Sequence, residues 1–181
     1  MVVGGGPAGS SAARIAAKNG CTVALIEKEK EIAETVRTSG VTWISDIQEF
    51  QIPEECYNPI KKFSFCSPKN SVTISDGIAK AAVLDVRKTY RFLAKRAESS
   101  GSEVFTNTNV SGILKNSLGK CVGVIAKSQD KHIQFKAKVV IDASGFSSVV
   151  ARELGHVKQW KKYGVGAEFE VKTEKLEYDN W

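Results

Sequence analysis

The order of apolar and polar positions at the start of the chain predicts a strand, a helix and a second strand. Val2 and Val3 end a buried strand, residues 10–19 carry small apolar side chains at helical spacing, and residues 21–27 are largely apolar again. Gly20 stands where the helix is expected to end. Because a strand, helix and strand in this order pair in parallel, the segment predicts the beginning of a parallel sheet.

A second helix is predicted at residues 83–101, where apolar positions recur at helical spacing. Asp85 stands where an N-cap is expected, and Gly101 ends the pattern. The helix face expected to be buried carries four residues: Tyr90, Leu93, Ala94 and Ala97. Residues 102–110 follow as a predicted strand.

The remaining segments alternate with a period of two, which predicts antiparallel strands. Residues 34–47 predict a loop leading into a short helix, and residues 59–75 predict a hairpin. Residues 110–144 predict a three-stranded meander whose final apolar run, residues 139–145, returns to the buried parallel sheet. Another strand is expected to begin within residues 163–173.

Aromatic residues of the middle segment are expected in the core of its β-rich layer. Trp43, Phe63 and Phe65 are large apolar side chains, which are usually buried. A wall of a substrate site is the alternative interpretation of these three residues.

The loop between the first strand and the first helix has glycines at a spacing that predicts a dinucleotide site. Gly4 permits a tight turn, Gly6 lets a diphosphate approach the main chain, and Gly9 allows close packing of the helix on the sheet. Pro7 and Ala8 lie between them, at the helix N-terminus, where free N–H groups attract phosphate. A reversing loop without a nucleotide is the alternative.

An acidic residue at the end of the second strand adds to this pattern. Glu27 can accept hydrogen bonds from both hydroxyls of an adenosine ribose. The same carboxylate repels a 2′-phosphate, so the motif favours NAD or FAD over NADP without choosing between them. Lys28 follows directly and is included among the expected cofactor contacts.

Composition and charge fit a globular protein. The chain has 181 residues, of which 42% are hydrophobic, enough for a substantial core. The net charge is +6, but lysines and arginines are scattered among 20 acidic residues and accompany no nucleic-acid-binding motif, so nucleic acid is not an expected partner.

The cysteines and the lengths of the apolar runs predict the cellular compartment of the protein. The four cysteines stand far apart, which predicts neither a zinc site nor a disulfide framework and favours reduced thiols. No charged leader precedes the glycine loop, and every apolar run is far shorter than the roughly 20 residues that cross a bilayer. We therefore expect a soluble, cytoplasmic protein with at most a peripheral contact with a membrane.

Three motifs resemble the FAD-dependent oxidoreductases of the p-hydroxybenzoate-hydroxylase fold and, within them, the geranylgeranyl reductase family. The first is the glycine loop through Glu27, the second is the arginine-bearing helix at residues 84–101, and the third is VVIDASGFSSVVARELG at residues 139–155. Together they span nearly the whole chain.

The resemblance implies an α/β fold with a Rossmann-like FAD-binding domain, a parallel sheet with a β-meander crossover, and the beginning of a β-rich substrate domain. Residues 1–39 and 85–158 would form the FAD-binding domain. Residues 40–84 would be an insertion contributing to the substrate domain, and residues 159–181 would start the truncated remainder of that domain.

The resemblance also implies further cofactor contacts. The family's third motif has a turn near the FAD diphosphate, and Asp142 and Gly145 belong to that turn here, with Ser144 in place of the family's common aspartate. Arg37 lies in a segment similar to one that covers the flavin, and Arg87 lies in the first turn of the second helix. A simply solvated arginine is the alternative for each of them.

The function that the resemblance implies is reduction of carbon–carbon double bonds in isoprenoid chains, such as those of archaeal lipids or chlorophyll precursors. Reduced FAD would deliver hydride, with a reduced nicotinamide or ferredoxin as external electron donor. The sequence identifies no catalytic acid. Family members are much longer, so we expect an amino-terminal part that is incomplete for catalysis. An aromatic monooxygenase or halogenase of the same fold, or a nucleotide-binding module without turnover, remain as alternatives.

Overall fold

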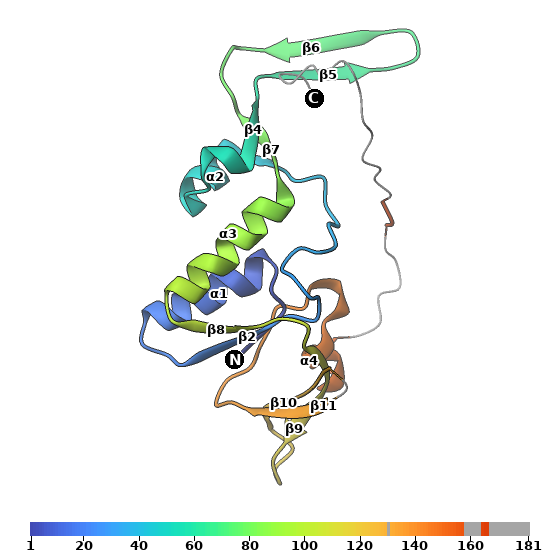
Figure 1. Cartoon of the computed structure of the whole chain (residues 1–181). Coiled ribbons are helices and arrows are strands. Elements are labelled where there is room, and N and C mark those ends of the chain that lie inside the picture. The colour runs from blue at the N-terminus through green and yellow to red at the C-terminus, as the bar shows by residue number, and fades with distance from the viewer. Residues whose placement is uncertain (130, 158–163, 167–181) are drawn as a thin grey trace. The chain divides into compact units, whose positions relative to one another are not determined.

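The computed structural model describes residues 1–129, 131–157 and 164–166, and the chain divides into two compact units (Figure 1). Unit 1 comprises Met1–Thr35 and Tyr90–Tyr163, and unit 2 comprises Val36–Thr89 and Gly164–Trp181. The boundaries expected from the sequence assign residues 36–39 and 85–89 to the nucleotide-binding part instead.

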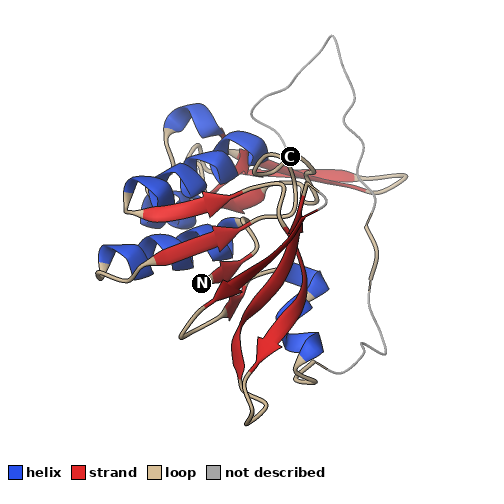
Figure 2. Ribbon diagram, turned by 60° about the horizontal axis from the view of Figure 1, so that its bottom comes forward, coloured by secondary structure: helices blue, strands red, loops and turns tan. Residues whose placement is uncertain are grey.

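Unit 1 is built on a four-stranded parallel sheet with the strand order β12-β1-β2-β8. Figure 2 draws the strands of the chain in red and its helices in blue. Its strands are β1 (Val2–Val3), β2 (Val23–Ile26), β8 (Ser102–Phe105) and β12 (Ile141–Asp142). The parallel pairing of β1 with β2, and the return of the chain to the sheet at β12, are confirmed. Strand β12 lies at the outside of the described sheet, where Ile141 is partly exposed.

The two faces of this sheet are covered by different layers because successive side chains of a strand point to opposite sides. Val2 and Leu25 pack in one cluster with Ala13 of α1 (Pro7–Lys18) and Ala97 of α3 (Val86–Ser99). These alanines are fully buried, so both helices lie close to the sheet.

The opposite face is covered by an antiparallel meander and a short helix. Val3 and Ile26 pack there against Val124 and Val150. The strand order of the meander is β11-β10-β9, as the alternating pattern predicts. The elements of this layer are β9 (Asn109–Lys115), β10 (Cys121–Ser128), β11 (Lys131–Lys136), η2 (Gly145–Ser147) and α4 (Val149–Glu153).

Helix α3 begins in unit 2 and continues into unit 1. The Lys88 N–H donates to the Asp85 Oδ1 atom at 3.0 Å, which confirms Asp85 as the N-cap. Hydrogen bonding from this N–H lowers the pKa of Asp85, against the opposing effect of partial burial, and the nearby Lys88 side chain adds to the lowering.

Unit 2 contains a three-stranded antiparallel sheet with the order β3-β7-β4. The short helix expected after residue 40 is present. The sheet itself was not predicted, because each strand is only three or four residues long. The elements around it are β3 (Val41–Trp43), α2 (Ile44–Phe50), η1 (Glu54–Cys56), β4 (Tyr57–Ile60) and β7 (Ala81–Leu84).

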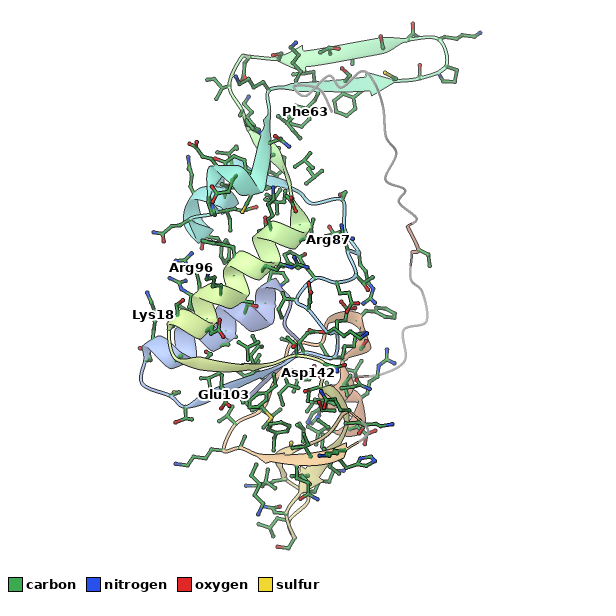
Figure 3. All side chains as sticks on the ribbon, viewed as in Figure 1. Lys18, Phe63, Arg87, Arg96, Glu103 and Asp142 are labelled. Atoms are coloured by element: carbon green, nitrogen blue, oxygen red, sulfur yellow. The ribbon has the colours of Figure 1, made fainter. Side chains whose placement is uncertain are left out.

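The predicted hairpin is confirmed as β5 (Lys62–Cys66) paired with β6 (Ser71–Ser75). Phe63, labelled in Figure 3, pairs with Ile74, and Phe65 pairs with Val72, so these four side chains share one face. We call them the hairpin apolar face.

The expectation that Phe65 and Trp43 lie in a core is wrong. Their side chains are 61% and 62% exposed, and Val72 and Ile74 are similarly exposed. Phe65 is exposed because, in the described part of the chain, β5 and β6 pair only with each other, and a two-stranded ribbon has no second layer in which to bury one face. Trp43 instead ends β3, an edge strand of the β3-β7-β4 sheet.

Two expectations fall outside the described residues. The strand expected within residues 163–173 and the start of a substrate domain at residues 159–181 lie there, apart from residues 164–166, which form no helix or strand. Among the residues that are described, no helix is long and apolar enough to span a bilayer.

We expect Gly123→Ala to destabilise unit 1. Gly123 has φ +155°, and an added Cβ would lie 2.1 Å from the Phe135 carbonyl oxygen of β11. The meander must shift to relieve this overlap, so the free energy of unfolding should fall by about 1–3 kcal/mol in urea titrations.

Gly112→Ala on β9 is the matched control, because its added Cβ would meet Ile125 at an ordinary 3.9 Å. Equal unfolding midpoints for the two variants would contradict the steric explanation.

Candidate functional site

The loop between β1 and α1 and the first turn of α1 are held by contacts that exclude side chains at two glycines. Gly4 has φ +104°, and an added Cβ would lie 2.3 Å from the Ala143 carbonyl oxygen. An added Cβ on Gly9 would lie 1.9 Å from the Gly4 carbonyl oxygen. The Gly4 N–H also donates to the Ile26 carbonyl of β2 at 2.8 Å. Both glycines are therefore required by the fold itself.

Gly6 differs from these two glycines because nothing occupies the space beside it. An added Cβ on Gly6 would meet no atom within 4 Å. Gly6 is the N-cap residue of α1, Pro7 follows at the first helical position, and the Ser10 N–H donates to the Gly6 carbonyl at 2.9 Å. The N–H groups of Ala8 and Gly9 precede this first helical bond and point out of the helix end. An anionic group would find bare main chain and a positive helix terminus here.

Glu27 follows β2 and directs its carboxylate to the glycine loop. The Gly5 N–H donates to its Oε2 atom at 2.7 Å, and the Glu29 N–H donates to its Oε1 atom at 2.9 Å. The Glu27 main chain is fixed by the Phe105 carbonyl and the Thr108 N–H. Each carboxylate oxygen can accept a second hydrogen bond, so the half-buried side chain retains capacity for a ligand hydroxyl.

The turn after β12 packs against the glycine loop through Ala143, whose N–H donates to the Val3 carbonyl at 2.8 Å. The Asp142 carboxylate, labelled in Figure 3, is engaged within this turn. Its Oδ1 atom accepts from the Ser144 hydroxyl at 2.6 Å and from the Ser144 N–H at 3.1 Å, and its Oδ2 atom accepts from the Ala151 N–H at 2.8 Å. Asp142 thus joins the end of β12 to the start of α4.

The electrostatics of Asp142 follow from these contacts. Partial burial opposes the charged form, but the hydrogen bonds from Ser144, Ala151 and Val150 outweigh it and lower the pKa of Asp142. The Ser144 hydroxyl links Asp142 to the first residue of α4, because it donates to Asp142 and accepts from the Val149 N–H at 2.9 Å. Gly145 follows with φ +64°, and an added Cβ there would meet no atom within 4 Å.

The site residues expected from the sequence divide between the two units. Unit 1 brings the glycine loop, Glu27 and the Asp142 turn together at the ends of β1, β2 and β12. Lys28 is exposed directly after Glu27. Arg37 and Arg87 are exposed and belong to unit 2, so their contacts with a cofactor stay predictions.

Two residues near the site, one in the loop and one in α1, were not predicted from the sequence. Gly5 supplies the N–H that binds Glu27, and its added Cβ would lie 2.5 Å from the Ile32 Cδ1 atom. Ser10 is fully buried, and its hydroxyl donates to the Gly5 carbonyl at 3.1 Å. The third consecutive glycine, and a hydroxyl on the buried face of a small-residue helix, were the available signals.

Comparison with known proteins gives the family context of this geometry. The family model for FAD dependent oxidoreductases matches residues 1–155. Digeranylgeranylglycerophospholipid reductase of Methanocaldococcus jannaschii is 36% identical over 159 residues, an alignment that covers 86% of this chain and 40% of that protein. The chain thus spans well under half the length of this relative.

Solved structures agree with the described fold. A geranylgeranyl bacteriochlorophyll reductase-like protein from Thermoplasma acidophilum superposes with a TM-score of 0.77 at 31% identity, covering 85% of this chain and 41% of the other. A myxobacterial chondrochloren halogenase superposes with a TM-score of 0.66 at 21% identity, covering 84% and 38% of the two chains. At this low identity, the similarity to the halogenase shows a shared fold alone.

We expect Asp142→Asn to lower stability at neutral pH. An asparagine amide cannot accept from both Ser144 and Ala151, so the variant should lose about 1–2 kcal/mol of unfolding free energy at pH 7. Because the pKa of Asp142 is lowered in the folded state, the carboxylate stabilises the fold above the unfolded pKa of about 3.9 and loses this effect as the pH falls through the folded value.

The difference between the wild type and Asp142→Asn in urea unfolding should therefore shrink on acidification. A difference that stays constant from pH 7 down to about pH 3 would refute the assigned role of the charge.

Proposed function

The chain belongs to the FAD dependent oxidoreductase family, and we propose on that premise that unit 1 holds FAD for the reduction of carbon–carbon double bonds in isoprenoid chains. The observation that carries the proposal is the open space beside Gly6 at the N-terminus of α1, next to the inward-facing Glu27 carboxylate. This pair fits the diphosphate and the ribose of one dinucleotide.

Residues of the glycine loop, the start of α1 and Glu27 have separate roles in this proposal. The main chain at Gly6, with the N–H groups of Ala8 and Gly9, binds the diphosphate. Glu27 accepts hydrogen bonds from the ribose hydroxyls and disfavours a 2′-phosphate. Gly4 and Pro7 set the turn and the helix start that hold these groups in place.

Five further residues extend the proposed site. Gly145 presents unobstructed main chain at the turn after β12, and Asp142 acts by holding that turn. Lys28, Arg37 and Arg87 contact the cofactor through their exposed cationic side chains. The charged group of Asp142 is engaged by main-chain N–H groups of its own unit.

The proposed substrate is a long isoprenoid chain, such as a geranylgeranyl group of a membrane lipid. Bound FAD in its reduced form supplies hydride for such a reaction. The names of the relatives support this substrate class, and the hairpin apolar face in unit 2 offers the kind of surface that a hydrocarbon chain buries.

Further partners belong to the same proposal. The electron donor is a reduced nicotinamide or a ferredoxin. The protein acts in the cytoplasm, where the exposed thiols of Cys21 and Cys66 stay reduced, and contacts the membrane surface peripherally to reach a lipid.

We expect the chain to bind FAD, and we expect the longer relative that matches it to saturate a geranylgeranyl lipid. The chain is incubated with FAD, a chemical reductant and a geranylgeranylated glycerophospholipid, and the lipid is analysed by mass spectrometry for two added hydrogens per double bond. Because the relatives are much longer than this chain, the same assay is run on the M. jannaschii reductase that matches it.

Three outcomes of this assay contradict the proposal in different ways. A chain that is colourless after incubation with excess FAD and desalting lacks the cofactor site. Oxygen-dependent consumption of a reduced nicotinamide with an aromatic substrate favours a monooxygenase. FAD binding by the chain, with no lipid reduction by either protein, leaves a nucleotide-binding module.

We expect Gly6→Val to abolish FAD retention while leaving the fold intact. The branched side chain would occupy the space proposed for the diphosphate, yet no protein atom lies within 4 Å of an added Cβ. Flavin absorbance after desalting should be lost, whereas the circular dichroism spectrum and the unfolding midpoint should match those of the wild type.

Gly112→Ala is the control, since it lies in the meander and should retain FAD. Undiminished FAD affinity in Gly6→Val would remove the diphosphate site from this loop.

A further inference from the structure

The segment that follows Glu27 determines how its carboxylate is presented. Residues 28–35 belong to unit 1 and form no helix or strand. Local hydrogen bonds shape the segment: the Lys30 N–H donates to the Glu34 carboxylate at 3.0 Å, and the Thr35 N–H donates to the Glu29 carboxylate at 2.9 Å. Local bonds alone do not position a loop against the rest of a fold, so its attachments to distant residues matter.

One attachment lies beneath the glycine loop. Ile32 is 8% exposed, and its Cδ1 atom lies where a Cβ on Gly5 would come within 2.5 Å. The same added Cβ would lie 3.1 Å from Glu27 side-chain atoms. Ile32, Gly5 and Glu27 therefore pack as one group, in which the Gly5 N–H donates to the Glu27 carboxylate.

A second attachment reaches the segment from α3. Arg91 donates from Nε to the Ile32 carbonyl oxygen at 3.2 Å and from Nη2 to the Glu31 carboxylate at 2.6 Å, across about sixty residues of sequence. A planar guanidinium fixes two acceptors at once, which a lysine ammonium does less well. A further long-range anchor is the Asn107 N–H, which donates to the Glu29 carbonyl at 2.7 Å.

We propose that Arg91 is a positioning residue of the dinucleotide site: by holding Ile32 and Glu31, it keeps Glu27 oriented toward the ribose. The inference rests on the proposed function, because it concerns FAD binding by the same loop. Arg91 itself touches neither Glu27 nor the glycines in any contact that the structure gives.

The expected size of the effect follows from the exposure of the ion pair. The Arg91 and Glu31 side chains are 51% and 67% exposed, so their attraction alone contributes little. The hydrogen bond to the Ile32 carbonyl is partly buried and adds to it. Without the ion pair and this hydrogen bond, residues 28–35 spend less time in the conformation that binds the dinucleotide. The apparent affinity for the dinucleotide falls in the same proportion. We expect a loss of about threefold to tenfold.

The test separates positioning of Glu27 from general destabilisation by using ligands of different size. FAD, ADP and inorganic diphosphate are titrated calorimetrically into the cofactor-free chain, as wild type and as Arg91→Ala. Arg91→Ala should bind FAD and ADP about threefold to tenfold more weakly and diphosphate unchanged, because diphosphate reaches the helix terminus without using Glu27. Arg91→Lys should recover part of the affinity.

Lys95→Ala is the matched control, since Lys95 is exposed one turn further along α3. It should bind all three ligands as the wild type does. Unchanged ADP affinity in Arg91→Ala, or an equal loss for ADP and diphosphate, would overturn the inference. Failure of the wild type to bind FAD would instead overturn the proposed function, and this inference with it.

Discussion

The first unit depends on close contact between main-chain segments that have no side chains between them. The Gly4 carbonyl lies where a Cβ on Gly9 would fall, and the Ala143 carbonyl lies where a Cβ on Gly4 would fall. A methyl group at either position would overlap a carbonyl oxygen, so the start of α1, the end of β1 and the turn after β12 can meet only because both residues are glycine. The open space at Gly6 is a consequence of this arrangement, because it brings the helix end to the edge of the sheet.

The Glu27 carboxylate couples that arrangement to the neighbouring strand. It accepts hydrogen bonds from the N–H of Gly5 in the glycine loop and from the N–H of Glu29, two residues further along the chain. One side chain therefore joins the end of β2 to the loop after β1. In a parallel sheet, ligands bind outside the carboxyl ends of the strands, where the connections diverge. Strand β1 is such a point here, since its neighbours are β2 on one side and β12 on the other. A carboxylate held at this point contributes to the fold whether or not a ligand is bound.

The features that the sequence predicted well are those in which a local pattern and its structural cause coincide. The tight turn at Gly4, the close packing at Gly9, the Asp85 cap and the alternating meander each follow from local stereochemistry, and each was found. The sheet of β3, β7 and β4 was missed because its strands are too short for alternation to register and pair across distant parts of the chain. Phe65 and Trp43 were expected in a core because large apolar residues are usually buried, but burial needs a second layer that composition does not reveal.

The structure separates residues of the candidate site that support the fold from those that can meet a ligand. Substitution at Gly4, Gly5 or Gly9 would create an overlap with the protein, whereas Gly6 faces open space, in agreement with the separate roles that the spacing predicts for Gly4, Gly6 and Gly9. Asp142 was expected to contact the cofactor, but its carboxylate is engaged by N–H groups of its own turn and of α4. A residue free to bind a ligand is therefore identified by what the fold leaves unoccupied around it. On that criterion the main chain at Gly6 and the remaining acceptor capacity of Glu27 define the site.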